Sequence, residues 1–314
     1  MAKCGSRPRA KGHQTNPCLE IMTRDTTENL IRECLDWRPA ECRGALLFHL
    51  HKKLPRFKGR ERLLHLLALR HARRRLRLVN GRGIRLTINP LEHIGYALCT
   101  KQSFEPLSLS LAVRIMAGGG VFLDAGANFG LYSLTLAGIP GVRCLAVDAL
   151  PQAVSLLHEH RFLNPQASME IFAAALSSSS SLMKLAAPHP GNFGTGRLSE
   201  TAGADALWVH STTLRSVLDA AGNPAVTLMK MDVEGHEFEA LLGMDLDSSG
   251  APPHLVLEQE PAVAGVAQFR AIWDLLHSKN YSAHDVLGNP LTFGDRPLEN
   301  NIWWTRHEQA VDAI

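Results

Sequence analysis

Short apolar runs alternate with amphipathic stretches from residue 104 onward. Runs of strand length predict strands over 121–124, 143–148, 169–174, 226–232 and 254–258. Apolar residues at helical spacing predict helices over 130–137, 151–162, 212–221, 236–243 and 265–279. This alternation is typical of a parallel sheet covered by helices on both faces, so we expect an α/β fold. Two last antiparallel strands are expected at 281–286 and 301–305, and the serine run 177–181 is expected to form a loop.

The N-terminal hundred residues show a different pattern. Apolar residues between 25 and about 72 recur at helical spacing and predict short helices. The stretch "RRRLRLVNGRGIRLTI" alternates apolar and charged residues around Asn80-Gly81, which predicts a hairpin. Residues 1–24 show no periodicity and predict a disordered basic tail. We therefore divide the chain into this tail, a helical and hairpin extension over 25–100, and a main domain over 101–314.

Charge also distinguishes the first hundred residues from the rest of the chain. The net charge of +3 over 314 residues conceals 21 Lys and Arg against 8 Asp and Glu within 1–100, which leaves the remainder acidic. The six cysteines form no Cys-x-x-Cys pair, which indicates free thiols in a reducing compartment. The basic start has no apolar secretory core, and no run reaches the ~18 apolar residues of a membrane span. We expect a cytoplasmic protein, with an organelle transit peptide as a minor alternative.

A glycine-rich turn follows the first predicted strand of the main domain, in "VFLDAGANFG" at 121–130. Gly126 lets a ligand approach the main chain, and the helix start after Gly130 offers unpaired N–H groups to an anion. A dinucleotide fingerprint needs a second glycine where this chain has Asn128, so a carboxylate fits better than a pyrophosphate. Asp148 ends the second strand. Its spacing along the sequence from Asp124 is the one at which such folds place an acidic residue that binds a ribose diol.

Carboxylate and ribose together indicate S-adenosylmethionine as the cofactor. The candidate cofactor-binding residues of this turn and strand end are Asp124, Gly126, Ala127, Asn128, Gly130 and Asp148. The alternative is purely structural, because aspartate and asparagine also form turns and helix caps.

A second polar cluster ends the fourth strand, in "VTLMKMDVEGHEFEALLGM" at 226–244, and we expect it beside the first strand. Its candidate catalytic residues are Lys230, Asp232, Glu234, His236 and Glu237. Methyl transfer to an alcohol needs a base for the hydroxyl proton, and a histidine with its intrinsic pKa of ~6.5 is suited to this role. An acidic residue of the cluster could serve instead, and the sequence leaves the choice open.

Two other interpretations of this cluster compete. Acidic residues in the first turn of a helix are favoured by its dipole, so capping alone is one alternative. A metal site formed by Asp232, Glu234 and His236 is another, but no second cluster supplies more ligands, so we expect no metal. Glu258 ends the fifth strand, where it lines the substrate side or is a solvated loop acid.

These motifs resemble the FkbM-type methyltransferases, a class I S-adenosylmethionine-dependent family, over about residues 104–286. The resemblance is carried by "FEPL", "FLDAGANFGLYS", "ALSSSSS", "TTLRSVLD" and above all "MKMDVEGHE" followed by "LVLEQE". It implies a Rossmann-like class I fold with seven strands, the last of them antiparallel. It also implies O-methylation of a hydroxyl on a sugar or secondary metabolite. Glu105 is implied to help close the cofactor pocket.

Three positions depart from the family pattern. Asp148-Ala149 stands where many members have Glu-Pro, and His236 stands where a small residue is commoner. The third strand ends without a clear acid or amide for the adenine amino group, so adenine recognition stays unassigned.

Two rival functions remain. The basic segment 52–86 could contact phosphates in an RNA methyltransferase, but no aromatic residues alternate with its arginines to stack on bases. The other rival is a non-catalytic binding relic of the fold. We expect a small-molecule or glycan hydroxyl as the acceptor, and the sequence predicts no oligomeric state.

Overall fold

The computed structural model describes residues 24–40, 55, 58–60, 62–63, 66, 75–186, 196–198, 203, 205–247, 250–259 and 265–306. The predicted disordered tail, most of the predicted helices between 41 and 72, and most of the basic segment before residue 75 lie outside this part of the chain.

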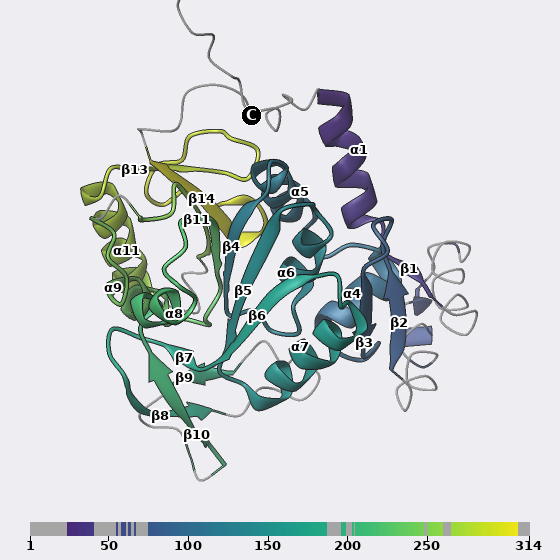
Figure 1. Cartoon of the computed structure of the whole chain (residues 1–314), viewed down its shortest axis with the longest axis horizontal. Coiled ribbons are helices and arrows are strands. Elements are labelled where there is room, and N and C mark those ends of the chain that lie inside the picture. Colours follow the sequence, from purple (N-terminus) through teal and green to yellow (C-terminus); the bar gives the residue numbers. More distant parts are fainter. Residues whose placement is uncertain are drawn as a thin grey trace, which may run out of the picture.

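A seven-stranded sheet forms the centre of the protein (Figure 1). Its strands are β4 (Gly120–Ala125), β5 (Val142–Asp148), β6 (Ser168–Ala173), β11 (Val226–Met231), β12 (His254–Glu258), β13 (Tyr281–His284) and β14 (Asn301–Arg306). They lie in the order β13-β14-β12-β11-β4-β5-β6, and β14 runs antiparallel to both of its neighbours. All seven predicted strands and the antiparallel last strand are confirmed. Because β4 pairs with β11 on one side and β5 on the other, the ends of all three strands meet at one edge.

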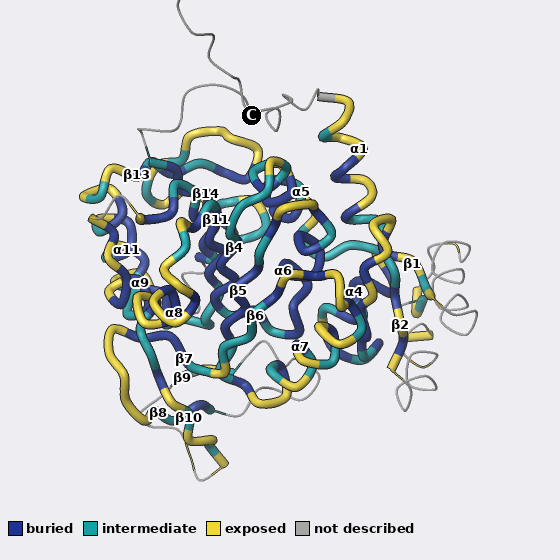
Figure 2. Tube along the Cα trace, in the orientation of Figure 1, coloured by how far each residue is buried: buried dark blue, intermediate teal, exposed yellow. Residues whose placement is uncertain are grey.

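Helices cover both faces of this sheet. The helices α5 (Pro106–Met116), α6 (Leu131–Ala137) and α7 (Pro151–Leu163) pack on one face, and α8 (Leu214–Ala220), α9 (Glu237–Leu242) and α11 (Val266–Ser278) on the other. The two faces form separate hydrophobic clusters, and Figure 2 shows the central strands as the most buried part of the trace. The five predicted helices are confirmed to within two residues at each end.

The N-terminal extension packs against the main domain. It contains α1 (Arg24–Leu35), β1 (Arg38–Pro39), β2 (Leu76–Val79), β3 (Arg85–Ile88) and α4 (His93–Lys101). The predicted hairpin is confirmed, since β2 pairs antiparallel with β3, and the buried Asn80 accepts hydrogen bonds from the backbone of Arg82 and Ile84 in its turn. Trp37 and Leu78 belong to the same hydrophobic cluster as α5 and α6. The boundary at residue 100 stays a prediction, and the two parts share a core.

A small second sheet was not predicted. It consists of β7 (Ala175–Leu176), β8 (Ser181–Ala186), β9 (Arg197–Leu198) and β10 (Leu207–Thr212) in the order β7-β10-β8-β9. Ser177–Ser180 form the expected loop, but Ser181 already begins β8. This sheet lies below the main sheet in Figure 1, near the carboxyl ends of β5 and β6. Among the described helices, none is long and apolar enough to cross a membrane.

Candidate active site

The glycine turn after β4 passes close to the end of β11. Gly126 has a φ of +84°, and a Cβ atom there would lie 1.8 Å from the carbonyl oxygen of Asp232. Only glycine therefore permits this approach. The N–H groups of Gly126 and Ala127 both donate to the carbonyl of Val147 at 2.9 Å, which ties the turn to the end of β5.

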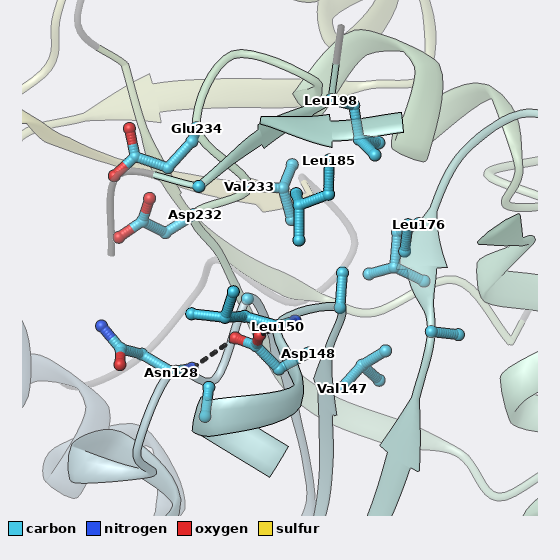
Figure 3. A pocket seen from close by; sticks show the side chains of 16 residues that line it. Asn128, Val147, Asp148, Leu150, Leu176, Leu185, Leu198, Asp232, Val233 and Glu234 are labelled. Atoms are coloured by element: carbon cyan, nitrogen blue, oxygen red, sulfur yellow. Dashed lines mark hydrogen bonds between the residues drawn. The ribbon is translucent and has the colours of Figure 1, made fainter. Parts of the chain in front are cut away.

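Asp148 holds the same turn from the neighbouring strand. Its Oδ2 accepts a hydrogen bond from the Asn128 N–H at 2.7 Å (Figure 3). Its Oδ1 accepts one from the Leu150 N–H at 2.8 Å. Burial raises the pKa of Asp148 to about 6, although these backbone hydrogen bonds oppose the shift. The Oδ1 atom of Asn128 is buried and has no hydrogen-bond partner in the described part of the chain. A buried acceptor without a donor indicates a place for a ligand group.

A cavity that is partly open to solvent lies over this edge of the sheet. Gly126, Asn128, Asp148, Asp232 and Glu234 bring polar groups to it, as Figure 3 shows for the last four. The rest of the lining is largely apolar and includes Leu150, Leu176, Leu185 and Leu198. Sequence reasoning missed the last three, which come from the small sheet. The stretch "SLMKLA" at 181–186 shows no period-two alternation, so the sequence carried no clear signal for Leu185.

Three of the predicted cofactor residues lie behind this lining. Asp124 is buried, and its Oδ2 accepts hydrogen bonds from the Ser133 N–H at 3.1 Å and the Ser133 Oγ at 2.6 Å. Burial raises its pKa to about 6, and the two bonds from Ser133 oppose the shift. Asp124 thus fixes the first turn of α6. Ala127 is buried, and Gly130 directly precedes α6, with a φ of +90° and the side chain of Leu157 close to its Cα.

Lys230 is a buried cation beneath the cavity. Its Nζ lies 3.5 Å from Asp232 Oδ2 and 5.5 Å from the centre of the Tyr132 ring. Burial by itself lowers the pKa of Lys230, but the carboxyl groups of Asp232, Glu105, Glu258 and Asp124 outweigh it, so the pKa is raised. The ammonium group therefore stays charged.

Glu105 connects this cation to the start of α5. It accepts a hydrogen bond from the Tyr132 hydroxyl at 2.7 Å and precedes α5 with a φ of +45°. Burial raises its pKa, and Lys230 opposes the shift. Glu105 lies beside the Lys230 cluster and outside the cavity lining.

The remaining members of the second cluster separate from one another. Glu234, with a φ of +54°, faces the cavity, and its Oε2 lies 3.7 Å from the Arg197 Nε. The Nε2 of His236 lies 3.2 Å from the Ser177 hydroxyl, outside the lining, and burial lowers the pKa of this histidine. The Oε1 of Glu237 accepts hydrogen bonds from the N–H groups of Val233 and Gly235, both at 3.1 Å. Glu237 thus closes the turn between β11 and α9.

The structure brings Asp232 and Glu234 to the cavity with Lys230 beneath them, and it places His236 and Glu237 elsewhere. Among the described residues, no three His, Cys, Asp or Glu side chains are grouped to hold a metal ion.

Comparison with known families identifies this arrangement. The family model described as "Methyltransferase FkbM domain" matches residues 124–283. The chain belongs to the FkbM methyltransferase family. The match begins at Asp124 and ends in β13, so it includes both the glycine turn and the Lys230 cluster. The resemblance inferred from the motifs is thereby confirmed.

Solved structures similar to this FkbM chain are distant methyltransferases. An O-methyltransferase from Bacillus cereus in complex with S-adenosylhomocysteine has 11% identity and a TM-score of 0.38, with 83% of this chain and 96% of the other covered. A TehB-like methyltransferase from Corynebacterium glutamicum has 13% identity and a TM-score of 0.38, with 67% and 93% covered. An rRNA methylase from Streptococcus thermophilus has 11% identity and a TM-score of 0.36, with 64% and 94% covered. None of the curated proteins matches the chain.

The FkbM family is S-adenosylmethionine-dependent, so this is the cofactor of the domain. The cavity fits it in two respects. Asn128 presents a buried oxygen without a donor, and Asp148 presents a carboxylate at the end of β5. The apolar lining beyond Asp148 can hold a flat heterocycle.

Proposed function

We propose that this protein is an S-adenosylmethionine-dependent O-methyltransferase acting on a hydroxyl group of a sugar or secondary metabolite. One observation carries the proposal: the Asp232 carboxylate, ion-paired with the buried Lys230, lines the same cavity as the glycine turn and Asp148. A cofactor site and a proton acceptor thus share one space, as transfer to an alcohol requires.

The lining supports an assignment of cofactor contacts. We propose that the turn at Gly126 and Asn128 receives the amino-acid end of the cofactor and that Asp148 accepts hydrogen bonds from the ribose diol. Leu150, Leu176 and Leu185 then surround the adenine ring. Glu105, Asp124, Ala127 and Gly130 act from behind this lining by fixing the turn and the helices next to it.

Asp232 is the proposed base. Among the five candidates of the second cluster, it combines an ionised carboxylate with a position on the cavity. Burial is the largest single influence on the pKa of Asp232 and raises it, but the charge of Lys230 and the hydrogen bonds that Asp232 accepts together lower the pKa, so the group stays ionised at neutral pH. Glu234 lines the acceptor side, and His236 and Glu237 hold the turn that carries it.

Methyl transfer from tritiated S-adenosylmethionine into cell extract tests this function. The extract is separated into small-molecule, glycan, protein and RNA fractions after incubation with wild-type protein or with Asp232→Asn. We expect label in the small-molecule or glycan fraction, reduced at least about tenfold by the variant, as for loss of a general base. Label confined to RNA would instead establish the RNA-methyltransferase alternative.

A matched control separates catalysis from folding. Asp219→Asn changes an exposed carboxylate on α8 that pairs with Arg215, and it should transfer label like the wild type. If no fraction is labelled by the wild type although it binds the cofactor, the non-catalytic relic becomes the better description.

A further inference from the structure

A second carboxyl group lies beside Asp232. The strands β11 and β12 run parallel with Met231 opposite Leu257, so the next residues, Asp232 and Glu258, lie side by side at the edge of the sheet. Alternation along the strands turns both toward the face of Lys230. The side chains of Asp232 and Glu258 are within hydrogen-bonding reach of each other. On its other side, Glu258 pairs in register with Asn301 of β14.

The charges in this cluster do not balance if every group is ionised. Glu258 faces Asp232 and Lys230 from β11 and Glu105 from the start of α5. Lys230 also interacts with Asp124, and Glu105 also interacts with Glu299. The single ammonium group of Lys230 thus has to compensate the charge of several largely buried carboxyl groups. Burying an uncompensated negative charge is costly, so at least one of these carboxyl groups keeps its proton.

The unpaired atoms indicate where this proton lies. Asp232 Oδ1 is buried and has no hydrogen-bond donor among the described residues, while Asp232 Oδ2 has Lys230 beside it. A proton on Glu258 supplies the missing donor. Burial and then the charge of Asp232 raise the pKa of Glu258 to about 10. At Asp232 burial also raises the pKa, but the charge of Lys230 together with the hydrogen bonds to the carboxylate lowers it overall. Two adjacent carboxyl groups in different environments therefore differ in protonation.

We propose that Glu258 is a positioning residue that carries a proton and donates it in a hydrogen bond to Asp232, so that Asp232 and Glu258 act as one pair toward the acceptor hydroxyl. The inference deepens the proposed function and rests on it for the catalytic role of Asp232. The hydroxyl O–H bond breaks as its proton passes to Asp232, and the new O–CH3 bond replaces the S–CH3 bond of the sulfonium, which becomes a neutral thioether. Glu258 keeps its proton throughout and fixes the direction of the Asp232 carboxylate.

Infrared spectroscopy of the cofactor-free protein tests the shared proton. Protein labelled with 13C in the glutamate side chains should show a shifted carbonyl band of a protonated carboxylic acid at pH 7.5. We expect Glu258→Gln to lose this band and the control Glu239→Gln, on α9, to keep it. If the wild type shows no such band, or if the folded Glu258→Gln keeps it in full, the inference is overturned.

Thermal stability gives a second readout without the cofactor. A carboxyl group whose pKa is raised in the folded state contributes stability below its unfolded pKa of about 4.5 and loses it as pH rises toward 10. Glu258→Gln cannot titrate, so its melting temperature relative to the wild type should rise steadily from pH 5 to pH 9. A difference independent of pH would contradict a retained proton.

Turnover then distinguishes the two proposals. Glu258→Gln still donates a hydrogen bond to Asp232 and should keep kcat within about threefold, whereas Glu258→Ala should lower kcat at least tenfold without changing cofactor affinity. Equal loss in both variants would overturn the positioning role. The spectra and melting curves need no substrate, so they remain decisive for the shared proton even if no acceptor is turned over and the proposed function fails.

Discussion

The ionisation of Asp148 determines how the proposed cofactor site depends on pH. The carboxylate must be charged to accept both ribose hydroxyl groups, and burial raises its pKa to about 6. We expect the affinity for S-adenosylmethionine to fall as pH decreases through this value, by up to about tenfold per pH unit below it. Calorimetric titrations between pH 5 and 7.5 measure the effect.

The matched variant for this prediction is Asp148→Asn. This variant should bind S-adenosylmethionine more weakly than the wild type at pH 7.5. Its affinity should also depend little on pH, because the amide does not titrate in this range. A variant with the full wild-type pH dependence would place the titrating group elsewhere, with Asp124 as the next candidate.

Ser133 stabilises the ionised form of Asp124. Removing its hydroxyl in Ser133→Ala should reduce the free energy of unfolding by about 1.5–3 kcal/mol, the range for hydrogen bonds to charged groups. The loss should be larger at pH 8 than at pH 5, because Asp124 ionises with a pKa of about 6. Urea unfolding at both pH values measures it, with the exposed Ser278→Ala on α11 as the control. An equal loss at both values would show that Asp124 stays protonated.

Single residues also show where sequence reasoning reached its limit. The sequence places Asp232, Glu234 and His236 in one candidate cluster. Glu234 and Gly235 adopt φ values of +54° and +92°, which reverse the chain and turn His236 toward Ser177. A non-glycine residue in the left-handed region is uncommon, so the sequence did not indicate it at Glu234.

At the scale of elements, the main sheet could be predicted because its strands and helices have clear periodicities and are long enough to show them. The small sheet could not, because β7 and β9 have two residues each. Their pairing depends on contacts across the sequence, such as Leu207 of β10 beside Leu185 of β8. The adenine side of the proposed site was missed for the same reason.

The strand β8 provides a test of that side. Leu185 is buried and lines the cavity, whereas Leu182 on the same strand is 59% exposed. We expect Leu185→Ala to weaken binding of S-adenosylhomocysteine by one to two orders of magnitude, about 1.5–3 kcal/mol for one apolar side chain. Leu182→Ala should bind like the wild type. Equal affinities of the wild type and the two variants would show that β8 does not contribute to the cofactor site.

At the scale of the whole molecule, the basic extension and the acidic main domain are joined by apolar packing and by hydrogen bonds between β3 and the buried side chains of His160 and Asn164. The ion pairs between them, such as Arg114 with Glu28 at 2.9 Å, are exposed, and such pairs contribute little. Leu78 of β2 is fully buried in the cluster formed with α5 and α6. The opposite charges of the two parts therefore contribute less to their association than buried side chains such as Leu78.

Unfolding of the intact chain tests this shared core. We expect Leu78→Ala to reduce the free energy of unfolding by about 2–5 kcal/mol and to keep a single transition by both near-ultraviolet and far-ultraviolet circular dichroism. Leu287→Ala, at an exposed position, should change it by less than about 0.5 kcal/mol. Two separate transitions would show that the extension and the main domain unfold independently.

We propose that the carboxyl edge of β4, β5 and β11 binds the cofactor next to the proton-accepting Asp232. A crystal structure of the protein with S-adenosylhomocysteine measures this most directly. We predict both ribose hydroxyl groups within hydrogen-bond distance of the Asp148 carboxylate and the cofactor sulfur on the Asp232 side of the cavity. A ligand bound elsewhere, or bound here with its ribose away from Asp148, would show that the cofactor site is not the one proposed.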